Sequence, residues 1–314
     1  MPTKASRRAP TALGNSGKFP ANAFRDFNAA TTNWSAKNAL ALAWASNLAY
    51  QADATISSVA AQWSLQAQPA VTGPLDIQGF VAGNKDILLI AFRGTINEKK
   101  GKFNPNNWLV NLDTRQIDIG PAFHTTGRVH EGFARAFSTL WAGIQADVDT
   151  IQNKIGSKAQ SLWITGHSLG GVLALMAAAA CTFSDNRIPF NGLYTFGQPR
   201  LGNPEFCGNC DIQFGQQYFR FVNDEDIVTR VPPRLFPHFP RPDIYGHCGQ
   251  LRYFDAQGGL HADEHYWNSF LANVEVGFQS LIELPNLPPI KDHEVKSGYI
   301  DHIGAYIQAG EPPM

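Results

Sequence analysis

The feature that most constrains the fold is a Gly-x-Ser-x-Gly turn, Gly166 to Gly170, between an apolar run and an Ala/Leu-rich run. The run before the turn, 161–165, predicts a strand, and the run after it, 172–180, predicts a helix. A serine on a sharp strand-to-helix turn exposes its hydroxyl, and only residues without a side chain fit beside it. We therefore expect a nucleophile elbow that presents Ser168, with the two glycines where side chains would clash.

The other predicted elements alternate along the chain in the order typical of an α/β domain. Apolar spacing predicts helices over 33–50, 132–155 and 294–309, and strands over 77–81, 87–92, 191–196, 218–222 and 250–254. No linker or internal repeat interrupts this series. We therefore expect one domain over residues 19–314, built on a central, mostly parallel sheet flanked by helices. Residues 1–18 are polar and small, which predicts a disordered tail.

Composition narrows the classes of partner. The formal charge is −1, which gives no electrostatic reason to expect nucleic acid. Only 16% of residues are charged and 44% are hydrophobic, which suggests an apolar surface that could face lipid. No apolar run approaches the ~20 residues of a transmembrane helix, so we expect peripheral contact with a lipid interface. Residues 1–18 also lack the apolar segment of a secretory signal, which favours a cytoplasmic protein or signal-independent secretion.

A serine hydroxyl becomes a nucleophile at neutral pH only with a histidine base, and that base needs a carboxylate to orient it. In the α/β-hydrolase order the acid follows the serine. Three acids, Asp224 to Asp226, follow a predicted strand at the end where open α/β sheets bind ligands, and we choose Asp226. The N–H of Leu169, at the start of the predicted helix, is a candidate oxyanion donor. This chemistry requires no metal or organic cofactor.

Several motifs together resemble the class 3, or fungal-type triacylglycerol, lipase family. In chain order they are Phe92-Arg93-Gly94-Thr95, Asn107-Trp108-Leu109-Val110-Asn111-Leu112, Val129-His130-Glu131-Gly132-Phe133, Thr165 to Gly171, Thr195 to Arg200, and Asp226-Ile227-Val228 with Pro232-Pro233. The resemblance implies an α/β-hydrolase fold, Thr95 as second oxyanion donor and Asp226 as the acid. It also implies a lid, about residues 96–111, which here carries an apparent insertion over 97–106.

The lid segment ends in two large apolar residues. Its polar sequence passes abruptly into Trp108 and Leu109, as expected of a lid that covers an acyl groove and meets lipid.

The base has more than one candidate. Members of the family usually carry an Asp-His pair before the last helix, and this chain has two such pairs, ending at His293 and His302. Three prolines precede His293, which places it at the entry to the helix, so we assign it as the base. His302 and His265 are the alternatives.

The leading interpretation is a serine carboxylic-ester hydrolase that cleaves acylglycerols through an acyl-enzyme intermediate. An esterase or feruloyl esterase, a phospholipase, or a non-catalytic lipid-binding protein of the same fold are the alternatives. The pair Cys207 and Cys210 is compatible with a disulfide, half of a metal site, or two free thiols. Without a second such pair, the sequence predicts no metal site.

Overall fold

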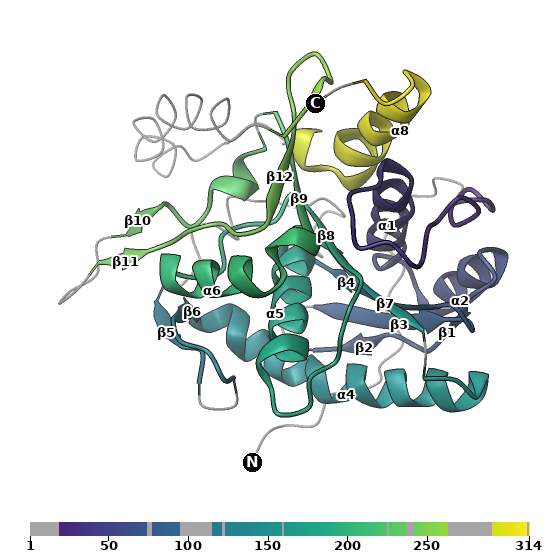
Figure 1. Ribbon diagram of the computed structural model, residues 1–314, viewed down its shortest axis with the longest axis horizontal. Helices are drawn as coiled ribbons and strands as arrows, with labels where there is room; N and C mark the ends of the chain where they lie inside the picture. Colours follow the sequence, from purple (N-terminus) through teal and green to yellow (C-terminus); the bar gives the residue numbers. More distant parts are fainter. Residues whose placement is uncertain are drawn as a thin grey trace.

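A nine-stranded sheet forms the centre of the protein, with helices on both faces (Figure 1). The computed structural model describes residues 19–73, 77–94, 115–120, 123–158, 160–224, 226–236, 242–262, 291–312 and 314. The sheet has the order β1-β3-β4-β7-β8-β9-β12-β13, and β2 also pairs with β3. These strands are β1 (Gln66–Ala67), β2 (Val71–Thr72), β3 (Gln78–Gly83), β4 (Ile87–Arg93), β7 (Ser161–His167), β8 (Gly192–Phe196), β9 (Tyr218–Asn223), β12 (Gln250–Phe254) and β13 (Leu260–His261).

The middle of the sheet is parallel, and its two edges are antiparallel. Strands β4, β7, β8, β9 and β12 run in the same direction, whereas β3 and β13 run against their neighbours. The carboxyl ends of the five parallel strands therefore meet at one edge of the sheet, where open α/β sheets bind ligands. Two small antiparallel pairs lie outside the sheet: β5 (Gln116–Asp118) with β6 (Arg128–His130), and β10 (Leu235–Phe236) with β11 (Asp243–Ile244).

The helices predicted from apolar spacing are confirmed. The described α-helices are α1 (Ala36–Leu48), α2 (Asp53–Gln62), α4 (Glu131–Ile155), α5 (Leu169–Phe183), α6 (Pro204–Phe214) and α8 (Asp301–Gln308). The side chain of Ser35 caps α1 by accepting a hydrogen bond from the N–H of Asn38. Before α8 the chain forms a 3-10 turn η4 (Lys291–His293) and a π-helical turn η5 (Val295–Ile300). Short 3-10 turns η2 (Gly215–Gln217) and η3 (Ile227–Arg230) flank β9.

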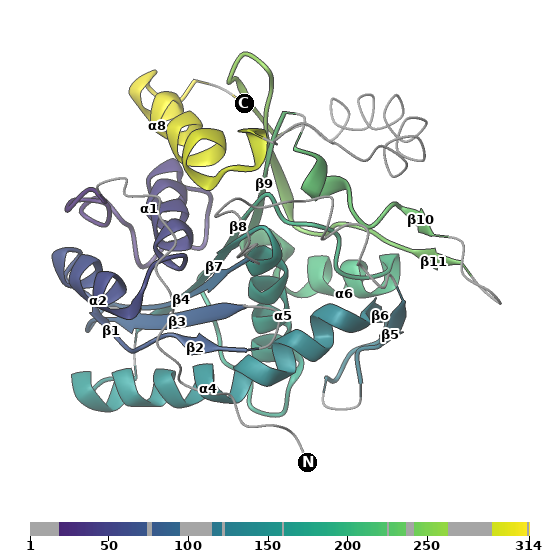
Figure 2. The same ribbon diagram turned by 180° about the vertical axis from the view of Figure 1, so that it is seen from behind.

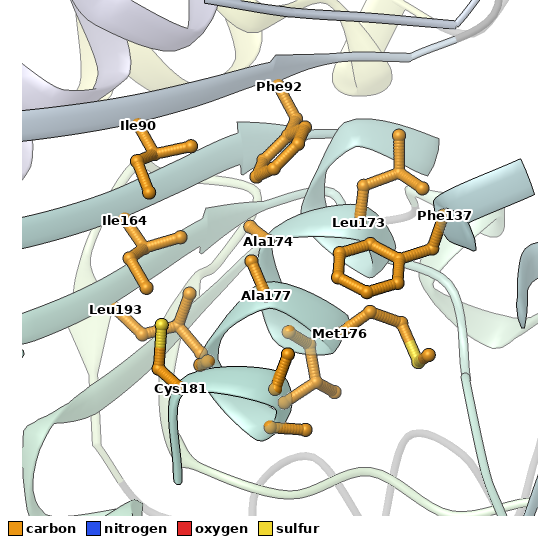
Figure 3. Packing of buried hydrophobic residues seen from close by; sticks show 14 of the residues in the cluster. Ile90, Phe92, Phe137, Ile164, Leu173, Ala174, Met176, Ala177, Cys181 and Leu193 are labelled. Atoms are coloured by element: carbon orange, nitrogen blue, oxygen red, sulfur yellow. The ribbon is translucent and has the colours of Figure 1, made fainter. Parts of the chain in front are cut away.

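Alternate side chains of each central strand pack into two separate cores. In β4, Leu88, Ile90 and Phe92 pack with α4 and α5 on one face, whereas Leu89 and Ala91 pack with α1 and α8 on the other. Figure 3 shows the first core, in which β4, β7 and β8 face the alanine-rich side of α5. Figure 2, turned by 180°, shows α4 crossing one face of the sheet while α1 lies on the other. Because both faces are covered, the central strands are mostly apolar.

Several sequence-based expectations fall outside the described residues. They concern the tail 1–18, the lid 96–111 and the individual residues Thr95, Trp108, Leu109 and His265. The cysteines are described: all four thiols are free and buried, so Cys207 and Cys210 are two free thiols within α6 and not a disulfide.

Candidate active site

The turn between β7 and α5 holds Ser168 in a strained conformation with φ 59° and ψ −131°. Two glycines make the turn possible. A Cβ on Gly166 would lie 2.1 Å from the carbonyl oxygen of Gly170, and a Cβ on Gly170 would lie 2.3 Å from that of Phe92. Both gaps are far below van der Waals contact with rigid backbone atoms, which explains why both positions are glycine. The elbow predicted from the sequence is therefore present, and packing on both sides maintains its strain.

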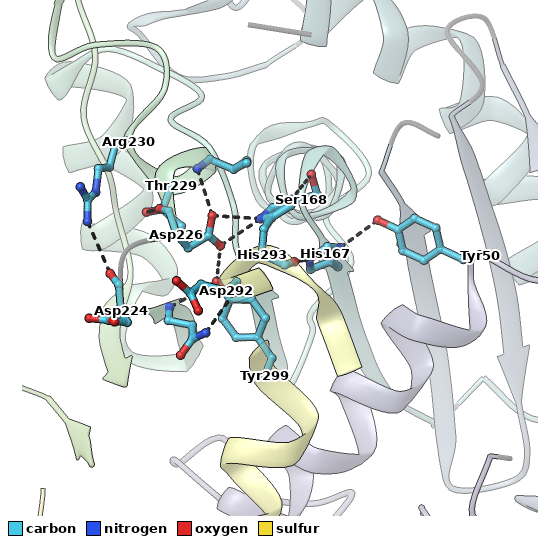
Figure 4. A network of polar contacts seen from close by, with 12 residues as sticks. Tyr50, His167, Ser168, Asp224, Asp226, Thr229, Arg230, Asp292, His293 and Tyr299 are labelled. Carbon is cyan, nitrogen blue, oxygen red and sulfur yellow. Dashed lines mark hydrogen bonds and ion pairs between the residues drawn. The ribbon is translucent and has the colours of Figure 1, made fainter. Parts of the chain in front are cut away.

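Ser168, His293 and Asp226 form one hydrogen-bonded chain. The Oγ of Ser168 lies 2.8 Å from Nε2 of His293, and Nδ1 of His293 lies 2.9 and 3.0 Å from the two carboxylate oxygens of Asp226. The three residues are 3%, 4% and 0% exposed, so water does not compete for these bonds. Figure 4 shows the three side chains converging from the elbow, the turn η4 and the loop after β9. Their order and geometry are those of a serine hydrolase triad.

Asp226 is held by donors on both of its oxygens. The N–H of Val228 donates to Oδ1 at 3.0 Å, and the hydroxyl of Tyr299 donates to Oδ2 at 2.5 Å. Burial, together with the charge of Asp226, raises the pKa of Tyr299, so this phenol remains a donor. Sequence analysis treated Tyr299 only as an apolar position of the last helix. Its spacing gave no sign of this contact, because the π-helical turn η5 alters the helical register there.

Gly197, directly after β8, makes room for the acid and the base. Its φ is +60°, and a Cβ there would lie 2.8 Å from Oδ2 of Asp226 and 2.9 Å from Nδ1 of His293. Any side chain would push apart the two groups that must remain hydrogen-bonded. The glycine in the Thr195 to Arg200 motif is therefore a requirement of the site.

Of the two Asp-His pairs, the structure brings only the first to the serine. His302 lies on α8, where its Nδ1–H donates to the carbonyl oxygen of Gly298 at 2.8 Å, one turn back on its own helix. The centre of its ring lies 5.3 Å from that of Phe254. His293 is thus the described histidine in contact with Ser168, while His265 lies outside the described residues.

Two backbone segments next to Ser168 could supply oxyanion donors. Leu169 opens α5, and the first N–H groups of a helix have no partner within the helix. Gly94, directly after β4, passes so close that a Cβ on it would lie 3.0 Å from Cβ of Ser168 and 3.1 Å from the carbonyl oxygen of His167. Thr95 follows Gly94 but is outside the described residues, as are Trp108 and Leu109.

Among the described residues, no group of histidines, cysteines and carboxylates is arranged to hold a metal ion. The ring of His261 pairs with Asp255 at 2.7 Å. The described helices are also all too short or too polar to cross a membrane.

Comparison with known proteins shows which family the chain is similar to. The sequence model of the class 3 lipases matches residues 89–236, the segment that contains β4, the elbow and Asp226. This segment is therefore similar to the class 3 lipase family. The chain has the α/β-hydrolase fold of that family.

Curated and solved relatives agree with this similarity. A lipase of Rhizomucor miehei is 31% identical over 171 residues, which cover 54% of this chain and 40% of the relative. A secreted mono- and diacylglycerol lipase of Fusarium solani is 35% identical over 141 residues, covering 44% and 39%. The solved Rhizomucor miehei lipase propeptide complex superposes with a TM-score of 0.51 at 27% identity, covering 64% and 60%. The chain thus matches about two fifths of the length of its curated relatives.

One buried and one partly buried histidine should make the stability of the protein fall in acid. Burial lowers the pKa of His167 and of His247 well below 6.5, helped by positive charge on His293 and on Arg220, respectively. Unfolding restores ordinary pKa values, so below about pH 6.5 the unfolded chain binds protons that the folded chain does not. We expect the free energy of unfolding to fall by up to about 1.4 kcal/mol per pH unit for each histidine.

Urea unfolding at a series of pH values between about 7.5 and 5 measures this slope. His167→Gln removes one of the two titrating groups. The free energy of unfolding of this variant should therefore change less with pH than that of the wild type. A wild-type stability that is constant or rises towards acid would contradict the expectation.

Proposed function

We propose that this protein is a serine carboxylic-ester hydrolase that cleaves acylglycerol esters through an acyl-enzyme intermediate. The observation that carries the proposal is the 2.8 Å contact between Oγ of Ser168 and Nε2 of His293, with the opposite ring nitrogen on Asp226. In this arrangement a neutral His293 accepts the serine proton, and the buried carboxylate stabilises the imidazolium that forms. A lipid-binding protein without activity would have no need of three buried polar groups in this order.

Acylation begins when Oγ of Ser168 attacks the ester carbonyl carbon and its proton moves to Nε2 of His293. The carbonyl oxygen becomes an oxyanion, which the N–H groups of Leu169 and Thr95 would receive. His293 then gives its proton to the departing alcohol oxygen, and the acyl group stays on Ser168. Asp226 keeps its charge throughout and fixes the tautomer of the base.

Deacylation repeats these steps with water as the nucleophile. His293 takes a proton from water, the resulting hydroxide attacks the acyl-serine, and a second oxyanion forms in the same place. Its collapse returns the proton to Oγ of Ser168 and releases the fatty acid. No cofactor enters either half of the cycle.

The proposed substrate class and lid follow from the family and from the sequence. The Fusarium solani relative is named a mono- and diacylglycerol lipase, which supports acylglycerols as substrates here. We further propose that residues 19–314 form one lipase domain in which residues 96–111, with Trp108 and Leu109, act as the lid. A lid with an apolar inner face opens more readily at a lipid surface, where that face is covered. This predicts a preference for aggregated over dissolved substrate.

A substrate series tests the proposed specificity. Purified protein is assayed with emulsified tri-, di- and monoacylglycerols, phosphatidylcholine, a feruloyl ester and a short-chain triacylglycerol taken through its solubility limit. We expect acylglycerols to be cleaved fastest, the rate on the short-chain substrate to jump where droplets form, and Trp108→Ala to reduce the jump.

Faster cleavage of phosphatidylcholine or of the feruloyl ester would move the assignment to the corresponding alternative. A smooth rise through the solubility limit, unchanged by Trp108→Ala, would contradict the lid. Hydrolysis equal to that of Ser168→Ala on every substrate would contradict enzymatic function itself.

A further inference from the structure

A second hydrogen-bonded chain reaches His293 from the side opposite to Asp226. The hydroxyl of Tyr50 lies 2.8 Å from Nδ1 of His167, and Nε2 of His167 lies 2.6 Å from the backbone carbonyl oxygen of His293. His167 is the last residue of β7 and precedes the nucleophile, so this chain joins the elbow strand to the turn that carries the base. Figure 4 shows Tyr50, His167 and His293 in this order.

The carbonyl group at the His293 end dictates where the protons lie. A carbonyl oxygen only accepts, so Nε2 of His167 must carry the proton that it donates to His293. In a neutral ring the other nitrogen then accepts, so Tyr50 must be the donor to Nδ1. The phenol oxygen in turn accepts the N–H of Gly94 at 3.3 Å. One arrangement of protons therefore satisfies every group in the chain.

The environment keeps His167 in this form. Its side chain is buried, and burial, followed by the charge of His293 when that residue is protonated, lowers its pKa well below the usual value. The rings of the two histidines lie 4.6 Å apart, centre to centre. His167 thus remains neutral and holds its N–H on the carbonyl while His293 changes charge during the reaction.

The peptide before His293 is held in the same manner from another strand. The side-chain amide of Asn223, the last residue of β9, donates to the carbonyl oxygen of Asp292 at 3.1 Å. The carbonyl oxygens of two consecutive residues are thus bound by side chains at the carboxyl ends of two strands of the central sheet. The turn η4 comprises only Lys291–His293, so its own hydrogen bonds cannot fix its orientation.

We propose that His167 is a positioning residue for the base: its Nε2–H holds the His293 carbonyl so that the imidazole stays in line with Oγ of Ser168, and Tyr50 sets the required tautomer. The proposal rests on the proposed function and adds to it a residue that touches no reacting atom. A displacement of the base by about 1 Å costs on the order of 100-fold in rate, so a single backbone hydrogen bond matters here. Because Tyr50 also binds Gly94, one hydroxyl supports both the base and the strand that leads to Thr95.

A histidine that only fills the core would behave differently when replaced. Its loss would lower the free energy of unfolding, but the folded fraction would turn over at the normal rate. Loss of a positioning hydrogen bond lowers kcat in the folded enzyme and leaves KM nearly unchanged. The two roles are therefore separable by kinetics on folded protein.

The test compares His167→Leu with His167→Gln on a dissolved short-chain ester. Leucine removes the donor, whereas the glutamine amide can place an N–H close to the position of Nε2. We expect kcat to fall about 100-fold in His167→Leu, with KM within about twofold of wild type. We expect His167→Gln to recover kcat to within about tenfold of wild type. Equal loss in both variants, or a His167→Leu enzyme with more than about a third of wild-type kcat, would overturn the proposal.

Tyr50→Phe keeps the test decisive if His167→Leu does not fold. This change leaves the imidazole in place and removes only the hydroxyl that fixes its tautomer. The loss of its hydrogen bond to His167 predicts a fall in kcat of about tenfold, again with little change in KM. Wild-type kcat in Tyr50→Phe would overturn the proposal, because the tautomer of His167 would then have no effect on the base.

A substrate-free measurement separates this proposal from the proposed function. The proton between Nδ1 of His293 and Asp226 gives a downfield proton NMR resonance when the base is held in place. We expect that signal in the wild type and in His167→Gln, and its broadening or loss in His167→Leu. A sharp signal in all three enzymes would refute positioning even if esters are hydrolysed. The expected pattern without any ester hydrolysis would refute the proposed function alone.

Discussion

Ser168→Ala is expected to reduce ester hydrolysis by about 10⁴-fold or more, because the triad then has no nucleophile. The fold should be unaffected. Alanine has the same Cβ as serine, so it meets the same strain at φ 59°. Ser168 is 3% exposed, and the hydroxyl that the change removes contacts His293. Initial rates on an emulsified triacylglycerol and a thermal unfolding curve measure the two effects.

The matched control is Ser297→Ala, which removes an exposed serine hydroxyl of the turn η5 that donates to the carboxylate of Glu294. This variant should hydrolyse the ester close to the wild-type rate. Turnover above about one thousandth of wild type in a folded Ser168→Ala protein would mean that another group attacks the ester.

His293→Ala is expected to cost about 10⁴-fold in kcat, whereas His302→Ala should keep most of the activity. The reason is geometric: Nε2 of His293 lies 2.8 Å from Oγ of Ser168, while the ring of His302 donates to Gly298 on its own helix. Both residues follow an aspartate in the same C-terminal segment, so the pair controls for general damage to this region. Steady-state kinetics on a dissolved ester, with unfolding curves for both variants, provide the comparison.

A larger loss of activity in His302→Ala than in His293→Ala would overturn the assignment of the base. Equal and severe loss in both variants, with intact folding, would show that the position of the whole last helix controls activity. In that case the hydrogen bond from His302 to Gly298 would be as important as the triad contact itself.

Sequence reasoning predicted the parts of this protein that depend on local patterns. The elbow was visible because only Gly166 and Gly170 tolerate its close backbone contacts, and the helices because their apolar faces recur at regular spacing. The choice of His293 followed from the three prolines before it, which place it at the entry to the last helix. Each of these signals lies within a few residues of the feature that it predicts.

Long-range contacts within the site could not be predicted in this way. Tyr50 and His167 are 117 residues apart in the sequence, and Tyr299 and Asp226 are 73 apart. Nothing in the pattern around Tyr50, which follows the helix α1, distinguishes it from an ordinary aromatic residue at a helix end. The packing of α1 and of the turn η5 against the same face of the sheet brings these hydroxyls to the triad. Sequence analysis did single out the motif that contains His167, but it could not say what the imidazole binds.

The free thiols illustrate the same limit. The spacing of Cys207 and Cys210 left a disulfide, a metal site and free thiols open. In the structure both lie within the helix α6 and both are buried and free.

Labelling with a fluorophosphonate, followed by peptide mapping, tests the central claim most directly, because this reagent reacts with serines activated by a neighbouring base. We expect a single adduct on Ser168, no adduct in Ser168→Ala and labelling that is slower by orders of magnitude in His293→Ala. Labelling of another residue, or none at all in folded wild-type protein, would contradict the account.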